Sequence, residues 1–238
     1  MKTVNIVHLY AKEMNIYGDN GNVLILQQRL AWRGIPVSVS VCNVGDMLPP
    51  DSHIIIGGGG QDAGQSSIAS DLQKKQKTLQ QMRDDGVVML MICGMYQMFG
   101  HYFRTQDGTE IPGISMLDVH TVAGKTRIIG NVRAKSEWGT LVGYENHSGK
   151  TYLGDTVAQL GITAGEQGNN GQDMTEGAVA QNVFGTYMHG PLLAKSPQFA
   201  DYLLAQALAL QGESKEALTK LDDSLAIQAR NVAAKRPR

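Results

Sequence analysis

The sequence predicts an α/β protein with a doubly wound, mainly parallel sheet, helices on both faces of that sheet and a C-terminal helical extension. Short apolar runs alternate with longer helix-like segments, which is the pattern of parallel strands joined by crossover helices. The run Val87–Ile92 is apolar at every position, as expected of a strand buried on both faces. A chain of 238 residues can also bury a substantial core, in one large domain or two small ones.

The N-terminal half of the chain is the more regular part. Its strands are expected at Val4–Tyr10, Val37–Val41, His53–Ile56 and Val87–Ile92, and its helices at Val23–Arg33 and Ser66–Asp85. Asn22 ends the Gly- and Asn-rich loop Lys12–Asn22 and is expected to cap the first helix, which stops before Gly34 and Pro36. Cys42 follows the second strand without a flanking glycine, so we interpret it as a structural residue.

The C-terminal half is less regular. Gly108–Asp118 and Thr121–Ala134 are expected to form strands of a mixed region that flanks the sheet, Gly161–Glu176 a Gly- and Asn-rich loop, Asn182–His189 an apolar strand, and Pro197–Gln211 and Lys215–Ala229 helices. These patterns divide the chain into a main domain over residues 1–211 and a C-terminal helical extension with a basic tail over residues 212–238.

Composition excludes several classes of protein. A formal net charge of −1 gives no general attraction for nucleic acid. The two cysteines, Cys42 and Cys93, form no CxxC pair, so we expect neither a disulfide framework nor a cysteine metal site, and the reducing cytosol is the expected compartment. No segment approaches the roughly 20 apolar residues that a transmembrane helix needs. We therefore expect a cytoplasmic protein without a transmembrane segment.

Cys93 lies where the apolar run ends and a helix-compatible pattern begins at Gly94. A sharp strand-to-helix turn of this kind is a nucleophile elbow, which holds the nucleophile in a strained conformation and requires small neighbours. Gly94 meets that requirement. The alternative interpretation is that Cys93 is a small core residue at the end of a buried strand.

The four-glycine loop Gly57–Gly60 precedes the elbow by one predicted helix and one strand. In a doubly wound sheet, loops after neighbouring strands converge at the carboxyl edge. Backbone N–H groups of Gly58 or Gly59, together with that of Gly94, would then form an oxyanion hole beside Cys93. Two alternatives stay open: a dinucleotide-binding loop, which lacks its acidic partner on a following strand, and a glycine-rich turn without a ligand.

A cysteine nucleophile needs a base, and the chain offers six histidines. His189 ends an apolar strand that closes in a Gly-Pro turn, so it is predicted to lie at the same sheet edge as Cys93. His147 is its main rival for the role. His8 and His53 lie within strand patterns and are interpreted as core or edge residues.

Five motifs, in order along the chain, now point to one family. They are His8–Asn22 with the helix to Gly34, the Gly57–Gly60 loop, Cys93–Gln97, Gly143–Gly149 and Tyr187–Gly190. Together they resemble the class I glutamine amidotransferases of the cobyric acid synthase (CobB/CobQ-like) type, and among these the GatD subunits of lipid II isoglutaminyl synthase. The resemblance extends to about Gln211 and implies a flavodoxin-like fold.

This resemblance implies a glutaminase that takes L-glutamine as substrate. Cys93 would attack the side-chain amide, and His189 would move the protons. Gln97 matches a position at which family members contact the substrate amide region. Arg127 matches an arginine assigned to substrate binding, and a guanidinium suits the α-carboxylate of glutamine. Without the resemblance, Arg127 would be interpreted as a surface charge on a strand.

The resemblance also implies a partner. The ammonia would pass to a MurT-like Mur-ligase subunit, which uses ATP and Mg to amidate the D-glutamate α-carboxylate of lipid II during peptidoglycan synthesis. ATP and Mg are expected on that subunit of the heterodimer, so this chain is expected to need no cofactor and no metal. Contact with lipid II through the partner would bring the complex to the inner face of the membrane, where the basic tail would face anionic headgroups.

One position departs from the wider family. Triad amidotransferases carry a carboxylate two residues after the histidine, and here that residue is Pro191. Three alternatives stay open: a Cys–His dyad, help from Glu145, or a carboxylate from the partner. Two other functions also stay open: amidation in cobyrinate or cobyric acid synthesis, although the chain has no P-loop, and a catalytically silent scaffold.

Overall fold

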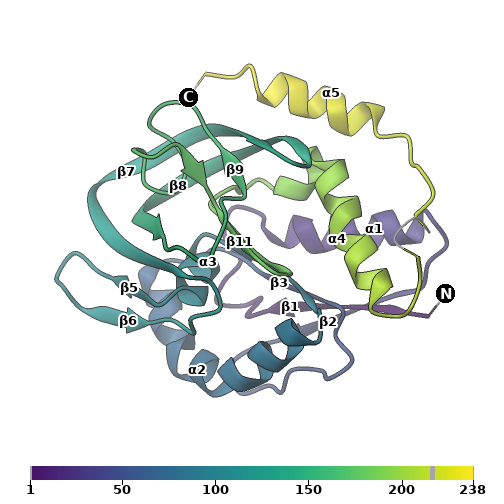
Figure 1. Ribbon diagram of the computed structural model, residues 1–238, viewed down its shortest axis with the longest axis horizontal. Coiled ribbons are helices and arrows are strands. Elements are labelled where there is room, and N and C mark those ends of the chain that lie inside the picture. The colour runs from purple at the N-terminus through teal and green to yellow at the C-terminus, as the bar shows by residue number, and fades with distance from the viewer. Residues whose placement is uncertain (1, 215–217, 238) are drawn as a thin grey trace.

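The computed structural model describes residues 2–214 and 218–237 and contains two six-stranded sheets (Figure 1). The strands are β1 (Val4–Leu9), β2 (Val37–Cys42), β3 (Ile54–Gly57), β4 (Val88–Ile92), β5 (Tyr102–Arg104), β6 (Glu110–Pro112), β7 (Val119–Ser136), β8 (Gly139–Leu153), β9 (Gly161–Ile162), β10 (Thr175–Glu176), β11 (Ala178–Ala180) and β12 (Val183–Thr186). The helices are α1 (Asn20–Ala31), α2 (Asp62–Asp84), α3 (Gly94–Phe99), the 3₁₀-helix η1 (Leu192–Lys195), α4 (Pro197–Ala209) and α5 (Ser224–Ala233).

The first sheet has the order β11-β12-β4-β3-β1-β2. All its pairings are parallel except the one between the edge strand β11 and β12. Helices α1 and α4 lie on one side of this sheet and α2 on the other (Figure 1). The predicted doubly wound, mainly parallel α/β architecture is therefore confirmed.

Burial explains why the central strands are short and apolar. Every residue of β3, β4 and β12 is buried, because each strand has neighbours on both edges and helices cover the sheet. Since β1, β3, β4 and β12 are adjacent and parallel, the loops that follow them meet at one edge. That edge carries the loop after β1, the glycine loop, Cys93 and His189.

The second sheet has the order β10-β9-β7-β5-β6, with β8 paired to β7. The antiparallel β7–β8 hairpin dominates it, and its register shifts between Ala123 and Ile128. The predicted strand Thr121–Ala134 is confirmed as part of the longer β7. The predicted strand Gly108–Asp118 was wrong over most of its length, because only Glu110–Pro112 is extended and the chain turns at Ser115 with φ +52°.

Three boundaries differ from the sequence-based expectations. Helix α1 begins at Asn20 after Asp19, and Asn22 is buried within its first turn rather than capping it. Helix α2 begins at Asp62, four residues before the expected Ser66. The expected helix Lys215–Ala229 begins instead at Ser224. Residues 215–217 of that range lie outside the described residues.

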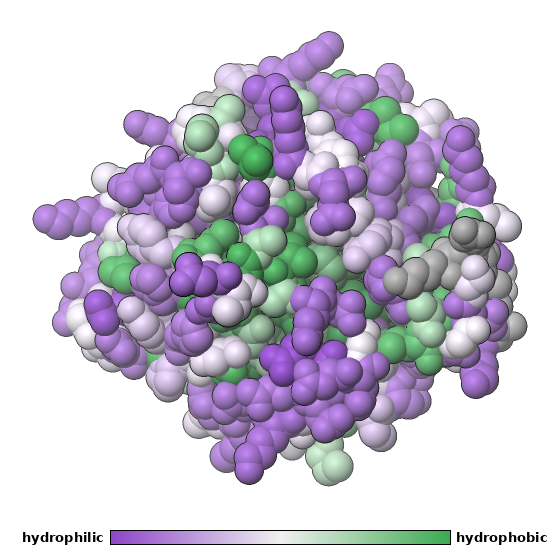
Figure 2. Space-filling view, viewed as in Figure 1, coloured by the Kyte–Doolittle hydropathy of each residue, from purple (hydrophilic) through white to green (hydrophobic). Residues whose placement is uncertain are grey.

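Hydrophilic and apolar side chains are distributed over the surface as in a typical globular protein. On the face in Figure 2, hydrophilic side chains form most of the periphery and apolar ones gather toward the centre. None of the helices formed by residues 2–214 and 218–237 is long and apolar enough to cross a membrane.

Candidate active site

Cys93 occupies a sharp, strained bend between β4 and α3. Its φ of +51° and ψ of −106° fall outside the regions that non-glycine residues favour, so the predicted elbow geometry is confirmed. The bend requires glycine next to it, because a Cβ on Gly94 would lie 2.7 Å from Met14 Cε and 3.1 Å from the Gly60 nitrogen. The other cysteine, Cys42, is buried in β2, away from the cavity that Cys93 lines.

His189 follows β12 and is fixed by the second sheet. Its backbone N–H donates to Tyr144 O at 2.9 Å, and its carbonyl accepts from the Tyr144 N–H at 3.1 Å. The imidazole is fully buried, and the Tyr17 ring meets it edge-on with centroids 4.9 Å apart. The structure brings His189 close enough to Cys93 for the sulfur to influence the charge of the imidazole. His189 Nε2 is buried and makes no hydrogen bond to the described residues, so it is available to the sulfur and to the substrate.

Asp19 orients the His189 ring. The Oδ1 and Oδ2 atoms of its buried carboxylate lie 2.9 and 3.0 Å from His189 Nδ1. Because a carboxylate only accepts, Nδ1 carries a proton and Nε2 is left for Cys93. Burial lowers the pKa of His189, but the neighbouring Cys93 and the Asp19 carboxylate outweigh burial and raise it to about 10. The arrangement therefore favours an imidazolium beside the sulfur.

Sequence reasoning missed Asp19. It treated the residue as part of a polar turn, because 170 positions separate Asp19 from His189. One signal was available: Asp19 lies in the loop after the first predicted strand, and in a doubly wound sheet that loop reaches the same edge as the elbow. Glu145 does not fill this role, since its carboxylate accepts from the Gly168 N–H at 2.9 Å and lies 3.7 Å from His147 Nε2.

The glycine loop lies beside the nucleophile, but the glycine that lines the cavity with Cys93 is not one of the two that were expected. The Gly59 N–H donates to Asp19 Oδ2 at 2.7 Å, so it is engaged away from Cys93. Gly59 also packs on the base, because a Cβ there would lie 2.5 Å from His189 Cε1. Neither Gly58 nor Gly59 lines the cavity that contains Cys93, whereas Gly60 does. Gly60 is therefore the loop glycine that faces the cavity beside Cys93, where a backbone donor to the oxyanion is expected.

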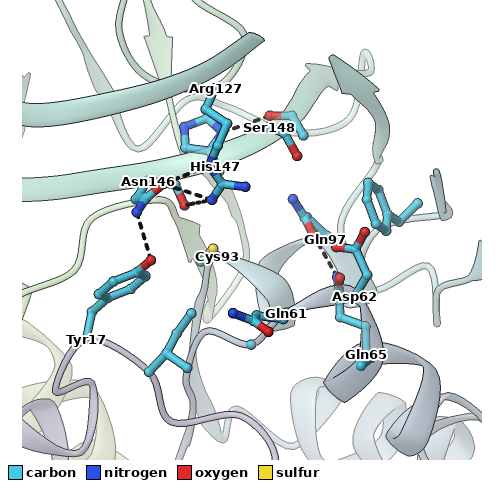
Figure 3. A pocket seen from close by; sticks show the side chains of 15 residues that line it. Tyr17, Gln61, Asp62, Gln65, Cys93, Gln97, Arg127, Asn146, His147 and Ser148 are labelled. Carbon is cyan, nitrogen blue, oxygen red and sulfur yellow. Dashed lines mark hydrogen bonds between the residues drawn. The ribbon is translucent and has the colours of Figure 1, made fainter. Parts of the chain in front are cut away.

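A cavity of about 340 Å³ opens beside Cys93, a size that suits a small metabolite (Figure 3). Arg127 from β7 projects into it. Asn146 holds that guanidinium, accepting at Oδ1 from Nε at 3.0 Å and from Nη2 at 2.8 Å. Asn146 Nδ2 donates in turn to the Tyr17 hydroxyl at 2.7 Å. A chain of contacts thus links Arg127 through Asn146 and Tyr17 to His189.

Gln97 also lines the cavity, at the end opposite Tyr17 (Figure 3). Its Oε1 accepts from Gln65 Nε2 at 2.7 Å, and its Nε2 donates to the Tyr187 hydroxyl at 2.9 Å. Both ends of the amide are therefore fixed by the protein, so Gln97 presents a rigid wall rather than a mobile contact.

His147, the rival base, lines the same cavity but is directed elsewhere. Its ring stacks on Tyr187 with centroids 3.6 Å apart, and Nδ1 donates to Gly149 O at 2.7 Å. Burial lowers the pKa of His147, although Glu145 opposes the shift. These contacts make His147 part of the wall. In the part of the chain that the structure describes, no group of three or more His, Cys, Asp or Glu side chains is placed to hold a metal ion.

Comparisons with known proteins agree with this geometry. A family model for the CobB/CobQ-like glutamine amidotransferase domain matches residues 5–197. The GatD subunit of lipid II isoglutaminyl synthase (glutamine-hydrolyzing) from Staphylococcus aureus is 37% identical over 98% of this chain and 95% of its own length. The GatD subunit from Streptococcus pneumoniae is 38% identical over 86% of this chain and 80% of its own length.

A solved structure supports the fold alone. PurLQS from Thermotoga maritima matches with a TM-score of 0.60 over 89% of this chain and 100% of that chain, at 16% sequence identity. The family match covers the sheet edge with its cysteine, histidine and glycine loop, and the likeness to two GatD subunits runs along most of the chain. The chain belongs to the family of CobB/CobQ-like glutamine amidotransferases.

Proposed function

We propose that this chain is the glutaminase subunit of a lipid II isoglutaminyl synthase and hydrolyses L-glutamine to glutamate and ammonia. The observation that carries the proposal is the strained Cys93, placed beside a His189 whose other nitrogen is held by Asp19. The extended likeness to GatD subunits supports the choice of this synthase among amidotransferases.

Acylation begins at Cys93. With the His189 imidazolium beside it, the sulfur attacks the side-chain carbonyl carbon of glutamine, and the carbonyl oxygen becomes an oxyanion. The backbone N–H groups of Gly94 and Gly60 are the candidates for stabilising that oxyanion. His189 then gives its proton to the leaving nitrogen, the C–N bond breaks, and ammonia leaves behind a γ-glutamyl thioester on Cys93.

Deacylation reverses these roles. The now neutral His189 takes a proton from a water molecule, and the hydroxide attacks the thioester carbon. A second tetrahedral intermediate collapses, the C–S bond breaks, and glutamate leaves while Cys93 and His189 recover their starting states. The sum is glutamine plus water giving glutamate plus ammonia. Asp19 keeps Nε2 directed at the reacting atoms in both steps.

The ammonia has a defined destination in this proposal. A MurT-like, ATP- and Mg-dependent ligase subunit would use it to amidate the D-glutamate α-carboxylate of lipid II. This chain itself would need no cofactor, because acyl transfer through a thioester requires only the nucleophile, the base and backbone donors. The protein is then a cytoplasmic component of peptidoglycan synthesis that reaches the membrane through its partner.

Ammonia release from L-glutamine tests the proposal. We expect the isolated chain to release ammonia, because Asp19 already orients His189, and we expect Cys93→Ala and His189→Ala to abolish release. With the ligase subunit, ATP and lipid II present, the ammonia should appear as amidated lipid II. Wild-type chain that releases no ammonia under either condition would refute the glutaminase assignment.

A further inference from the structure

The cavity beside Cys93 is lined by one cationic and one anionic side chain. Among its described lining residues, apart from the nucleophile, only Arg127 and Asp62 have side chains that are ordinarily charged at neutral pH. His147 also lines the cavity, but burial lowers its pKa, which favours the neutral ring. The charges of the cavity thus balance as a pair.

Asp62 is the first residue of α2 and lies across the cavity from Arg127, which comes from β7 (Figure 3). Within residues 2–214 and 218–237, its carboxylate makes no hydrogen bond or ion pair with another side chain or with the backbone. An acidic residue in the first turn of a helix stabilises that helix wherever its side chain points. That role does not require the carboxylate to line a substrate cavity opposite a guanidinium.

Arg127 is similarly prepared for a ligand. Asn146 holds its Nε and Nη2 atoms, whereas Nη1 makes no hydrogen bond to the described residues. The side chain is therefore fixed in place while one donor group stays available. A fixed donor costs less conformational entropy on binding than a mobile one.

We propose that Asp62 binds the α-ammonium group of free glutamine while Arg127 binds its α-carboxylate. This inference rests on the proposed glutaminase function and names the residue that restricts it to a free amino acid. A zwitterion places one positive and one negative group on the same carbon atom, which matches the charge pair of the cavity. A glutamine within a peptide has neither charge and would leave both Asp62 and Arg127 unpaired.

Two substrates separate this role from a structural one. L-Glutamine carries the α-ammonium group, and 4-carbamoylbutanoate is the same molecule without it. We expect Asp62→Asn to raise the KM for glutamine about 10- to 100-fold, the usual value of a hydrogen bond between charged groups. The kcat should change little, because the contact is the same in the ground and transition states. The kcat/KM for 4-carbamoylbutanoate should stay at its wild-type value.

Asp84→Asn is the matched control. It makes the same chemical change in the last residue of the same helix, where Asp84 pairs with its neighbour Arg83 on the surface and lies outside the cavity beside Cys93. We expect it to leave both substrates unaffected. Asp62→Glu should recover part of the affinity for glutamine, because it restores the charge with a longer side chain.

The inference is overturned if Asp62→Asn leaves the ratio of kcat/KM for glutamine to kcat/KM for 4-carbamoylbutanoate unchanged, which includes the case in which both values fall equally. Calorimetric binding of the two ligands to the Cys93→Ala variant separates this result from failure of the proposed function. Suppose that Cys93→Ala prefers glutamine to 4-carbamoylbutanoate, that adding Asp62→Asn removes this preference, and that the wild-type chain hydrolyses neither ligand. The binding role of Asp62 then stands and the glutaminase role fails.

Discussion

At the scale of single residues, the site depends on which nitrogen of His189 faces the sulfur. Asp19 decides this, because its carboxylate accepts a hydrogen bond from the Nδ1–H and leaves Nε2 for Cys93. The same carboxylate accepts the Gly59 N–H, so one buried acid fixes both the base and the glycine loop. Asp19 thus contacts Nδ1 of the histidine, although the position two residues after the histidine is occupied by Pro191.

Asp19→Asn tests this role. The amide can still contact Nδ1 but carries no charge, so the imidazolium loses stabilisation and the pKa of His189 falls from about 10. We expect kcat for glutamine hydrolysis to fall about 100-fold, within the usual range for general acid–base catalysis. The alkaline limb of the pH–rate profile should move to lower pH, because deprotonation of His189 removes the general acid.

The fold of this variant should persist, because asparagine has nearly the same shape as Asp19 and keeps one oxygen that can accept a hydrogen bond at this buried position. Thermal unfolding checks that point. A wild-type profile with an unshifted alkaline limb in Asp19→Asn would contradict the assignment of Asp19.

Asn146→Ala tests how Arg127 is held. The substitution removes the side-chain oxygen that accepts from Nε and Nη2 and leaves only the bond from Nη2 to the Asn146 backbone carbonyl, so the substrate must supply more of the ordering of the guanidinium. We expect the KM for glutamine to rise about 10-fold with little change in kcat. Tyr17→Phe removes only the hydroxyl that fixes Asn146, and it should raise KM less. Steady-state kinetics would contradict this account if Asn146→Ala left KM at its wild-type value.

Sequence reasoning reached the residues that a local pattern marks. Cys93 was found because an apolar run ends at a small neighbour, and His189 because a strand ends in a turn. Asp19 and Asp62 carry no such mark, since each looks like an ordinary residue of a polar loop or helix start. Gly60 lies in the glycine loop that the sequence marks, but the sequence does not show which glycine of that loop lines the cavity. Their roles arise from positions at the shared sheet edge, and those positions depend on the order of the strands.

At the scale of elements, buried charges attach the C-terminal segment to the main sheet. Arg29 of α1, which is buried, binds Asp201 of α4 and Asp223 just before α5, each with one N–O distance of 2.6 Å. Arg33 shares Asp201 at 2.7 Å. Helix α5 itself buries no residue, so these ion pairs and the contacts near them hold it.

Two substitutions rank these ion pairs. Asp201→Ala removes the partner of two guanidinium groups, and we expect it to lower the free energy of unfolding by about 2 kcal/mol. Asp223→Ala leaves Arg29 paired with Asp201, so a loss of about 1 kcal/mol is expected. Denaturant unfolding measures both. An equal or reversed order would contradict the central place of Asp201.

Glu176, at the end of β10, predicts a pH dependence of stability. Burial raises the pKa of this carboxyl to about 7, aided by the Glu145 carboxylate and opposed by hydrogen bonds from Thr186 and Tyr187. The stabilisation of its protonated form is fully present below the unfolded pKa of 4.5 and is lost as pH rises through about 7. Wild-type stability should therefore fall between pH 4.5 and 7 by up to roughly 3 kcal/mol from this group.

Glu176→Gln should remove that part of the slope, because the amide does not ionise and its oxygen still accepts from Thr186 and Tyr187. Glu166→Gln, on the exposed neighbouring loop, is the control and should keep the slope. Unfolding free energies at pH 5 and pH 8 give the comparison. An unchanged slope in Glu176→Gln would argue against a neutral Glu176 in the folded protein at pH 5.

The elements that sequence reasoning found and missed differ in one physical respect. Strands of the first sheet are apolar on both faces, so their composition identifies them. In β8 every second residue from Gly143 to Thr151 is buried, but that face includes Glu145 and His147 rather than apolar residues. The two-residue alternation of burial that is typical of a strand is therefore present in β8. The sequence does not reveal it, because the buried face carries polar side chains.

At the scale of the whole molecule, the site lies where the two sheets meet. The first sheet supplies Cys93, Asp19 and the glycine loop at its carboxyl edge, and the second supplies Arg127 and Asn146 from β7 and β8. His189 joins them, since it follows β12 and pairs through its backbone with Tyr144 of β8. The long hairpin therefore serves as the upper wall of the cavity in Figure 3.

The division of the chain at residue 211 into a main domain and a helical extension stays a prediction, and the site lies entirely on one side of it. Every residue assigned to glutamine chemistry precedes Gly212, and α5 contributes none of the residues that line the cavity beside Cys93. We expect the catalytic arrangement to depend on contacts between the two sheets.

Covalent labelling tests the central claim most directly. Diazo-oxo-norleucine resembles glutamine and alkylates the nucleophile of glutamine amidotransferases, and the chain provides its own control in the buried Cys42. Peptide mass spectrometry should find one adduct, on Cys93, that excess L-glutamine suppresses and that Cys93→Ala abolishes together with ammonia release. An adduct on Cys42 instead, or glutamine hydrolysis at the wild-type rate by Cys93→Ala, would contradict the account.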